Sequence, residues 1–247
     1  MGKTTVRLLL VQVFLLITVF LGGAAIDKKL TAEQAMKNIT WFHHDSFMIE
    51  LAGKTVYIDP FKINSSKPAD FILVTHEHYD HCSPEDIKKI MKKDTVIICP
   101  AQAAEKLKGF NVKVIKSPES VMAGEIKIEA VPAYNTNKPF HPKKDGKVGY
   151  ILNYGGVRIY HMGDTDFTEE MKNSGKISIA LVPVSGTYVM NAKEAAEAVD
   201  AIKPEIAVPM HYGLIVGNKN DGEDFKKNVK NKAIKVIVLK EGASYAE

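Results

Sequence analysis

The chain contains 247 residues, of which 45% are hydrophobic, 25% charged and 8% aromatic. Such a composition is typical of a globular protein with its own core, and it excludes a disordered tail, a collagen-like fibre and a coiled coil. Lys and Arg outnumber Asp and Glu by 33 to 29, a net charge of +4. That small excess argues against a nucleic-acid-binding surface, which needs a clustered basic stripe.

The first segment has the layout of a secretory signal peptide. Two basic residues precede an apolar run over residues 8–21, and small residues follow it up to residue 25. A retained anchor is the alternative, because a run of ~20 apolar residues spans a bilayer. We therefore expect residues 1–25 to be a signal peptide or an N-terminal membrane anchor. Residues 26–247 should then be exported, periplasmic or extracellular, and touch a membrane only through an uncleaved 8–21 segment.

The rest of the chain alternates β-rich runs with helical segments. Short β-rich runs fill residues 39–59 and break at His43-His44-Asp45 and at a turn over residues 52–54. This alternation, without a long linker, predicts one layered α/β domain with sheets inside and helices outside. Further strands are expected at 71–75, 95–99, 112–115, 125–131, 148–153, 157–160, 177–182, 206–209 and 233–239, and helices at 84–91, 101–107, 192–201 and 224–229.

Metal-ligating residue types are most concentrated directly after the expected strand at 71–75. There the chain reads His76-Glu77-His78-Tyr79-Asp80-His81. Three imidazoles and a carboxylate at the end of a buried strand are costly to pack without a ligand, and together they suit zinc, iron or manganese. The segment therefore predicts a metal site, with a solvated polar loop as the alternative.

Three further motifs follow expected strands in a fixed order. Asp59 ends the run VYID, Asp164 lies in YHMGDT, and His211 lies in VPMHYG. With these motifs the chain resembles the metallo-β-lactamase superfamily, whose signature is H-x-H-x-D-H after a buried strand, over about residues 39–238. The motifs HHDSF, GDTD and PMHYG are most similar to its metal-dependent hydrolase branch. That branch is akin to L-ascorbate-6-phosphate lactonase and N-acyl-phosphatidylethanolamine phospholipase D.

The resemblance implies an α/β fold, a four-layer αβ/βα sandwich with the metals in a cleft between its halves. It also implies two divalent ions, Zn²⁺ in the first place, with Mn²⁺ or Fe²⁺ as alternatives. Asp59 would orient the metal loop from behind the ligands. By the same resemblance His76 and His78 would bind the first ion, Asp80, His81 and His211 the second, and Asp164 would bridge the two.

One position departs from the family pattern. Relatives usually supply a third histidine to the first ion where this chain has Asn135, and His141 follows six residues later. We expect His141 to complete the site, because imidazole is a far better ligand than carboxamide for a transition metal. In the alternative, His141 lies on a surface loop and the first site is weak, water-filled or ligated by Asn135.

His44 should lie near the metals and hydrogen-bond a ligand or substrate, unless it belongs to an exposed loop pair with His43.

This ligand set predicts an enzyme, a metal-dependent and binuclear hydrolase of an ester, lactone or phosphodiester. A metal-bridging hydroxide would attack, and Asp80 would be the catalytic residue that orients it and assists proton transfer. The competing hypothesis is a non-catalytic metal-binding or surface-interaction protein on the same fold. A flavodi-iron-type oxidoreductase is disfavoured, because that group has Glu where this chain has His78 and carries a flavodoxin-like domain.

The expected substrate is a small molecule. A lysine-rich segment over residues 135–147 is relevant to the charge of that substrate. It is either a solvated surface loop or a lid that attracts an anionic group.

The sequence leaves two states open for the two cysteines. Cys82 and Cys99 either form a disulfide or remain two separate thiols, of which Cys99 would be buried.

Overall fold

Two seven-stranded sheets form the centre of the computed structural model, which describes residues 2, 29–65 and 67–245. The expected signal peptide or anchor at 1–25, with its apolar run at 8–21, lies outside the described residues. Between residues 29 and 245, position 66 apart, no helix is both long and apolar enough to cross a membrane.

The first sheet holds the N-terminal half of the chain and the last short strand. Strands β3, β4, β5 and β6 run parallel to one another, while β1 and β2 pair antiparallel. Its order is β14 (Ala243–Ser244), β1 (Ile39–His43), β2 (Ser46–Leu51), β3 (Lys54–Ile58), β4 (Ala69–Leu73), β5 (Met91–Cys99) and β6 (Val112–Val114).

The second sheet is built from the C-terminal half. Strands β10 to β13 run parallel, and β7 to β10 form an antiparallel meander. Its order is β13 (Lys235–Val236), β12 (Ile206–Met210), β11 (Ile179–Pro183), β10 (Val157–His161), β9 (Val148–Tyr154), β8 (Ile126–Pro132) and β7 (Ser120–Ala123).

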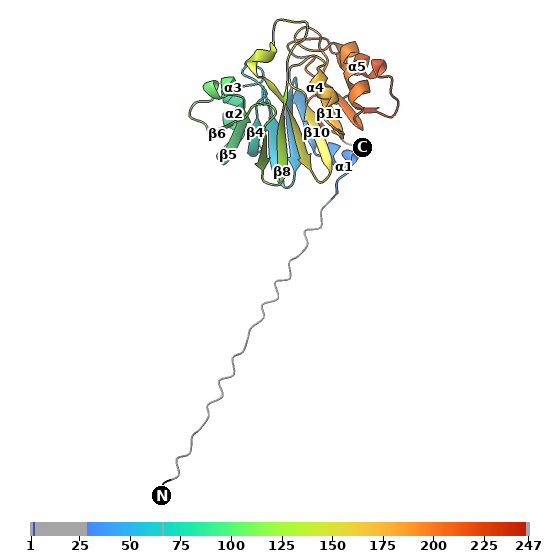
Figure 1. The fold of residues 1–247 in the computed structure, drawn as a ribbon. Helices are drawn as coiled ribbons and strands as arrows, with labels where there is room; N and C mark the ends of the chain where they lie inside the picture. The colour runs from blue at the N-terminus through green and yellow to red at the C-terminus, as the bar shows by residue number, and fades with distance from the viewer. Residues whose placement is uncertain (1, 3–28, 66, 246–247) are drawn as a thin grey trace.

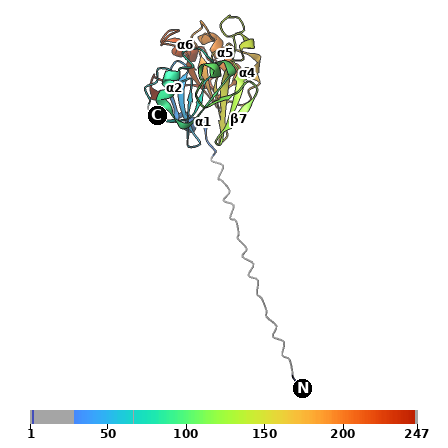
Figure 2. The same ribbon diagram turned by 90° about the vertical axis from the view of Figure 1, so that its left-hand side faces the viewer.

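Helices cover the outer faces of both sheets. Figure 1 shows α2 (Pro84–Ile90) and α3 (Ala101–Lys106) on one flank, and α4 (Glu169–Lys172) and α5 (Ala192–Ile202) on the other. In the turned view of Figure 2, α6 (Asp221–Asn228) lies near α5 and α1 (Ala32–Met36) lies at the opposite end. This helix–sheet–sheet–helix order confirms the predicted four-layer αβ/βα sandwich.

The apolar core has two parts. The larger one lies between the sheets and under α5 and α6, and it contains the buried rings of Trp41, Phe47 and Tyr150. The smaller one lies between the first sheet and helices α2 and α3. Strands β11 and β12 are buried at every position, as expected for parallel strands covered on both faces. Two rigid sheets thus support the loops at their edges.

Some expected elements are shorter or displaced. The strand predicted at 233–239 is only Lys235–Val236, because this edge pairs with β12 alone. The helix predicted at 224–229 begins earlier, at Asp221. Five short elements were not predicted, since so few residues show no periodicity: α1, β7, β14, α4 and the 3₁₀ turn Lys143–Asp145.

The cysteines are two free thiols rather than a disulfide. Cys82 and Cys99 are both buried, and both belong to the apolar cluster under α2 and α3. Burial raises the pKa of each thiol to about 12. The thiols therefore stay protonated at neutral pH and act as small apolar side chains.

Candidate metal centre

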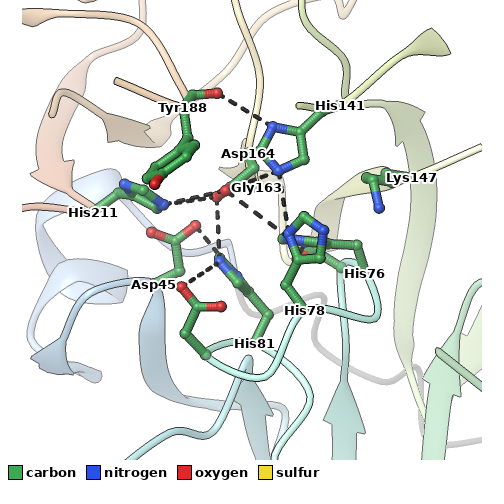
Figure 3. Close-up of polar contacts among 12 residues, drawn as sticks. Asp45, His76, His78, His81, His141, Lys147, Gly163, Asp164, Tyr188 and His211 are labelled. Atoms are coloured by element: carbon green, nitrogen blue, oxygen red, sulfur yellow. Dashed lines mark hydrogen bonds and ion pairs between the residues drawn. The ribbon is translucent and has the colours of Figure 1, made fainter. Parts of the chain in front are cut away.

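Five chain segments carry metal-ligating side chains to one edge of the two sheets. His44 follows β1, the segment His76–His81 follows β4, and His141 lies between β8 and β9. Asp164 follows β10 and His211 follows β12. Carboxyl ends of neighbouring parallel strands share an edge, which is why residues so distant in sequence meet. Figure 3 shows the side chains of His76, His78, His81, His141 and His211 converging around Asp164.

Three histidines form what we call the first cluster: His76, His78 and His141. His76 Nε2 lies 3.0 Å from His78 Nδ1, and His141 Nε2 lies 3.4 Å from the same atom. Asn135 does not take the place of the third ligand. Its Oδ1 accepts a hydrogen bond from the backbone N–H of His141 at 3.0 Å and lies 3.2 Å from His141 Nδ1. The structure thus brings His141 to the cluster and Asn135 behind it.

The second cluster comprises Asp80, His81 and His211. His81 Nε2 lies 3.8 Å from Asp80 Oδ2. His44 also points here, with Nε2 3.1 Å from Asp80 Oδ2. One ring nitrogen each of His44, His81 and His211 lies within 4.8 Å of the other two. His44 is fully buried, so the structure places it at the site and not in an exposed loop pair.

Asp164 lies between the two clusters. Its Oδ2 is 3.3 Å from His141 Nε2 in the first cluster. Its Oδ1 is 3.4 Å from His81 Nε2 and 3.1 Å from His211 Nε2 in the second. The side chain is 3% exposed, so solvent does not separate these atoms. A carboxylate in this position can serve two ions at once.

Unsatisfied buried atoms indicate that the clusters fit metal ions. Among the described residues, His81 Nε2 and Asp164 Oδ1 are buried without a hydrogen-bond partner, as are both carboxylate oxygens of Asp45. Buried polar atoms normally find partners, because leaving one unpaired is costly. Here the unpaired atoms are the electron-pair donors that transition metals bind.

Neighbouring side chains fix the orientation of the donors. Asp59 Oδ2 accepts a hydrogen bond from His81 Nδ1 at 2.8 Å, and Asp59 is itself held by the Thr75 backbone N–H and hydroxyl. His211 Nδ1 lies 2.9 Å from Ser185 Oγ. Such contacts set which ring nitrogen faces the metal. Asp59 thus lies where the resemblance places it.

Burial and charge prepare the two clusters differently. Burial is the main cause that lowers the pKa of each first-cluster histidine, so these rings are neutral and ready to bind. Burial would also lower the pKa of His81 and His211, but the charge of Asp164 raises both. Burial would raise the pKa of Asp80, but the hydrogen bond with His44 brings it to about 2.

The backbone is strained at the same place. His44, Asp59 and His211 have φ values of 52°, 45° and 60°, in the left-handed region that disfavours residues with a side chain. Each such residue costs about 1–3 kcal/mol, and such strain tends to persist at functional sites. Three turns that carry or support donors are therefore held against their local preference.

A cleft of about 500 Å³ opens onto both clusters. Five donor residues line it: His78, Asp80, His141, Asp164 and His211. A larger cavity, about 780 Å³, lies on the outer side of the second sheet. It contains none of the donors, so the metal chemistry belongs to the smaller cleft.

The remaining expectations have mixed outcomes. His43 points away from the metals, with Nε2 2.8 Å from the Phe61 carbonyl oxygen. The lysine-rich segment is largely tied down: Lys138 pairs with Asp166, Lys143 with Glu170, and the buried Lys147 with Glu77. Three of its four lysines thus have ion-pair partners.

Sequence reasoning missed one buried side chain at the site, Asp45. It directly follows His43-His44 at the end of β1 and lies within ligand distance of two donor sets. The HHD triplet at the end of an expected strand was the sequence feature that could have indicated Asp45 as a site residue.

Comparison with known proteins shows the family to which the chain belongs. The family model described as Beta-lactamase superfamily domain matches residues 38–211. A UPF0173 metal-dependent hydrolase of Pyrococcus furiosus is 37% identical over 234 residues, covering 85% of this chain and 99% of the relative. One of Methanopyrus kandleri is 32% identical over 239 residues, covering 84% and 98%.

Two solved structures are also similar to this chain in sequence and fold. A crystal structure from Parabacteroides distasonis has a TM-score of 0.74 and 36% identity, covering 81% of this chain and 91% of the other. Igni18, a metallo hydrolase from Ignicoccus hospitalis, has a TM-score of 0.72 and 26% identity, covering 83% and 95%.

Proposed function

The chain belongs to the metallo-β-lactamase superfamily, and from that premise we propose that it is a binuclear metal-dependent hydrolase of an ester, lactone or phosphodiester. The observation that carries the proposal is Asp164, whose carboxylate contacts both histidine clusters. It lies 3.3 Å from His141 Nε2 of the first cluster, and 3.4 Å from His81 Nε2 and 3.1 Å from His211 Nε2 of the second. One carboxylate shared in this way suits a pair of ions better than a single ion.

In this proposal His76, His78 and His141 hold one ion, and Asp80, His81 and His211 hold the other. Zn²⁺ suits the imidazole-rich set, with Mn²⁺ or Fe²⁺ as alternatives. A bound pair would lower the pKa of a shared water toward ~7 and polarise the substrate oxygen. Asp80, whose pKa is about 2, is ionised at neutral pH; it would orient the nucleophile, take up the proton that the nucleophile releases and pass that proton to the leaving group.

The walls of the cleft support a substrate with an apolar part and an anionic part. Tyr79 and Phe140 line the cleft and are 65% and 43% exposed, so their rings offer apolar surface to a substrate. Phe140 packs edge-on against Tyr188 at 4.6 Å between ring centroids. Lys106 is the only lysine or arginine among the described residues that line it. We take it as the group that attracts the anion.

The metal part is tested by removing ligands. Replacing His78 or Asp164 by Ala should abolish turnover and lower the bound metal, measured by elemental analysis. His43→Ala is the matched control, because that ring bonds a backbone carbonyl outside the clusters. Unchanged turnover in H78A or D164A would rule the proposal out. Two tightly bound ions without turnover of phosphodiester, lactone, ester and β-lactam panels would favour the non-catalytic alternative.

The substrate part is tested on the cleft walls. Lys106→Gln should raise KM several-fold for anionic substrates and leave neutral ones unchanged, because it removes only charge. Phe140→Ala should raise KM for long acyl esters relative to acetates. Val114→Ala, an exposed apolar residue away from the cleft, serves as control. Equal effects of K106Q on neutral and anionic substrates would contradict the assignment.

Export of the domain remains part of the proposal, since residues 1–25 carry the signal-like pattern. N-terminal sequencing of the secreted or membrane fraction tests it. A new N-terminus near residue 26 is expected after cleavage, and an intact one in the membrane fraction would indicate an anchor.

A further inference from the structure

Asp45 presents an unusual carboxylate. The side chain is 0% exposed, and neither Oδ1 nor Oδ2 has a hydrogen-bond partner among the described residues. Its carbonyl oxygen accepts from His161 Nε2 at 2.9 Å, and the carboxylate has a 3.8 Å ion pair with His81 Nδ1 but no hydrogen bond. A buried carboxylate without a hydrogen bond destabilises the folded protein. A bound cation would compensate for this penalty.

The surroundings of Asp45 point toward the second cluster. Its Oδ2 lies 3.8 Å from His81 Nδ1. One of its oxygens lies within 4.8 Å of the donor atoms of both Asp164 and His211. Figure 3 shows the carboxylate beside the His81 and His211 rings. Its contact with His81 is to the ring nitrogen that also binds Asp59, so Asp45 approaches the second cluster on the side of Asp164 and His211.

Asp45 and Asp80 approach from different sides. Asp80 lines the cleft and its side chain is 16% exposed, whereas Asp45 is fully buried and does not line the cleft. Asp59 cannot play the same role, because His81 and Thr75 already occupy its oxygens. With Asp45 and Asp164, the second cluster contains three carboxylates, while the first shares only Asp164.

We propose that Asp45 is a further carboxylate of the second metal site and makes it an oxygen-rich site suited to Mn²⁺ or Fe²⁺, whereas the three-histidine site suits Zn²⁺. The physical basis is ligand preference: carboxylates favour hard ions such as Mn²⁺, and imidazoles favour zinc. The inference rests on the metal pair of the proposed function.

Metal titration without substrate tests this assignment. The full chain is stripped with a chelator, given one equivalent of Zn²⁺, and titrated with Mn²⁺ while the electron paramagnetic resonance signal reports free Mn²⁺. Wild type should bind one Mn²⁺. Asp45→Asn, nearly isosteric and uncharged, should weaken that binding by about 10–100-fold and retain the zinc.

Two further variants control for folding and for general loss of charge. Asp86→Asn removes another buried carboxylate, 5% exposed and bound to Lys62, Ser83 and Lys89, and should bind Mn²⁺ like wild type. Asp45→Ser, which is smaller, provides the measurement if Asn does not fit. Circular dichroism of each metal-free variant establishes that it is folded.

The outcomes separate this inference from the proposed function. An Mn²⁺ dissociation constant within twofold of wild type in D45N would overturn it and would make Asp45 a neutral acid without a metal role. Equal weakening in D86N would overturn it too. A wild type that takes a second Zn²⁺ but no Mn²⁺ refutes only this inference, and one that holds a single ion of any kind also refutes the binuclear proposal.

Discussion

At the scale of single residues, the site depends on side chains that bind no metal themselves. Asn135 is the clearest case. It is 8% exposed, its Oδ1 contacts the backbone N–H and Nδ1 of His141, and its Nδ2 donates to the Tyr188 carbonyl oxygen at 2.9 Å. The amide thus ties two loops together and points His141 Nε2 at the first cluster. Orienting partners of this kind commonly change metal affinity as strongly as ligands do.

Replacing Asn135 by Ala should therefore weaken the first site without removing a ligand. We expect the Zn²⁺ affinity of that site to fall about 10–100-fold, measured by competition with a chromophoric chelator. Asn137→Ala, an exposed amide two residues along the loop, should leave the affinity unchanged. An N135A protein with wild-type zinc affinity would show that His141 is held by its own loop.

At the scale of elements, the start of helix α2 is tied to a neighbouring loop. Helix α2 begins after Ser83, whose hydroxyl accepts from the Asp86 backbone N–H. The Asp86 carboxylate in turn accepts from the Ser83 hydroxyl at 2.8 Å, the Lys62 backbone N–H at 2.8 Å and Lys89 Nζ at 2.7 Å. One buried acid therefore holds the helix N-terminus to the loop after β3.

This arrangement predicts a specific pH dependence of stability. Burial would raise the pKa of Asp86, but hydrogen bonds from Lys89 and Ser83 lower it below the usual value. A lowered folded pKa contributes stability above the unfolded pKa of about 3.9, and that stability is lost as the pH falls toward the folded value. Asp86→Asn should reduce the unfolding free energy by about 1–3 kcal/mol at pH 7, with a smaller difference below pH ~4.

Urea unfolding of the metal-free protein between pH 7 and 3 measures this difference. Asp94→Asn, which changes an exposed carboxylate in β5, the strand after α2, provides the baseline. A D86N deficit that stays constant across the range would mean that the hydrogen bonds, and not the charge, supply the stability.

At the scale of the whole molecule, the metal centre joins the two halves of the sandwich. His76, His81 and Asp80 come from the loop after β4 in the first sheet, whereas Asp164 and His211 come from the ends of β10 and β12 in the second. A bound ion therefore links segments that are otherwise held together by the apolar core between the sheets. Metal binding and global stability should be coupled.

Metal at 100 times its dissociation constant should raise the unfolding free energy by about 2.7 kcal/mol per site and the melting temperature by about 5–10 °C. Thermal unfolding with added Zn²⁺ and with a chelator measures this gain. His81→Ala in the loop after β4 and His211→Ala after β12 should each lose the share of the gain that the second site contributes, because either change removes a ligand of that ion while the first ion is retained. If added metal leaves the melting temperature of the wild type unchanged, the coupling is disproved.

Much of this architecture could be predicted because it is written in local patterns. Buried parallel strands such as β4 and β12 are mainly apolar runs, and two of the metal motifs, His76–His81 and His211, follow them. The short edge strands and α1 escaped prediction, since two to five residues carry too little periodicity. The same limit explains why the last strand was expected to be longer than it is.

The sequence by itself determined the layered fold, the family and the segments that carry metal donors, because periodicity and motif spacing are properties of neighbouring residues. Only the tertiary structure decided that His141 and not Asn135 faces the first cluster, that His44 is buried against Asp80, and that Asp45 lies unpaired beside His81. These facts depend on which strand ends meet at one edge, and that contact joins residues up to 166 positions apart, from Asp45 to His211. The distance between such residues is set by the packing of two sheets, which no local pattern encodes.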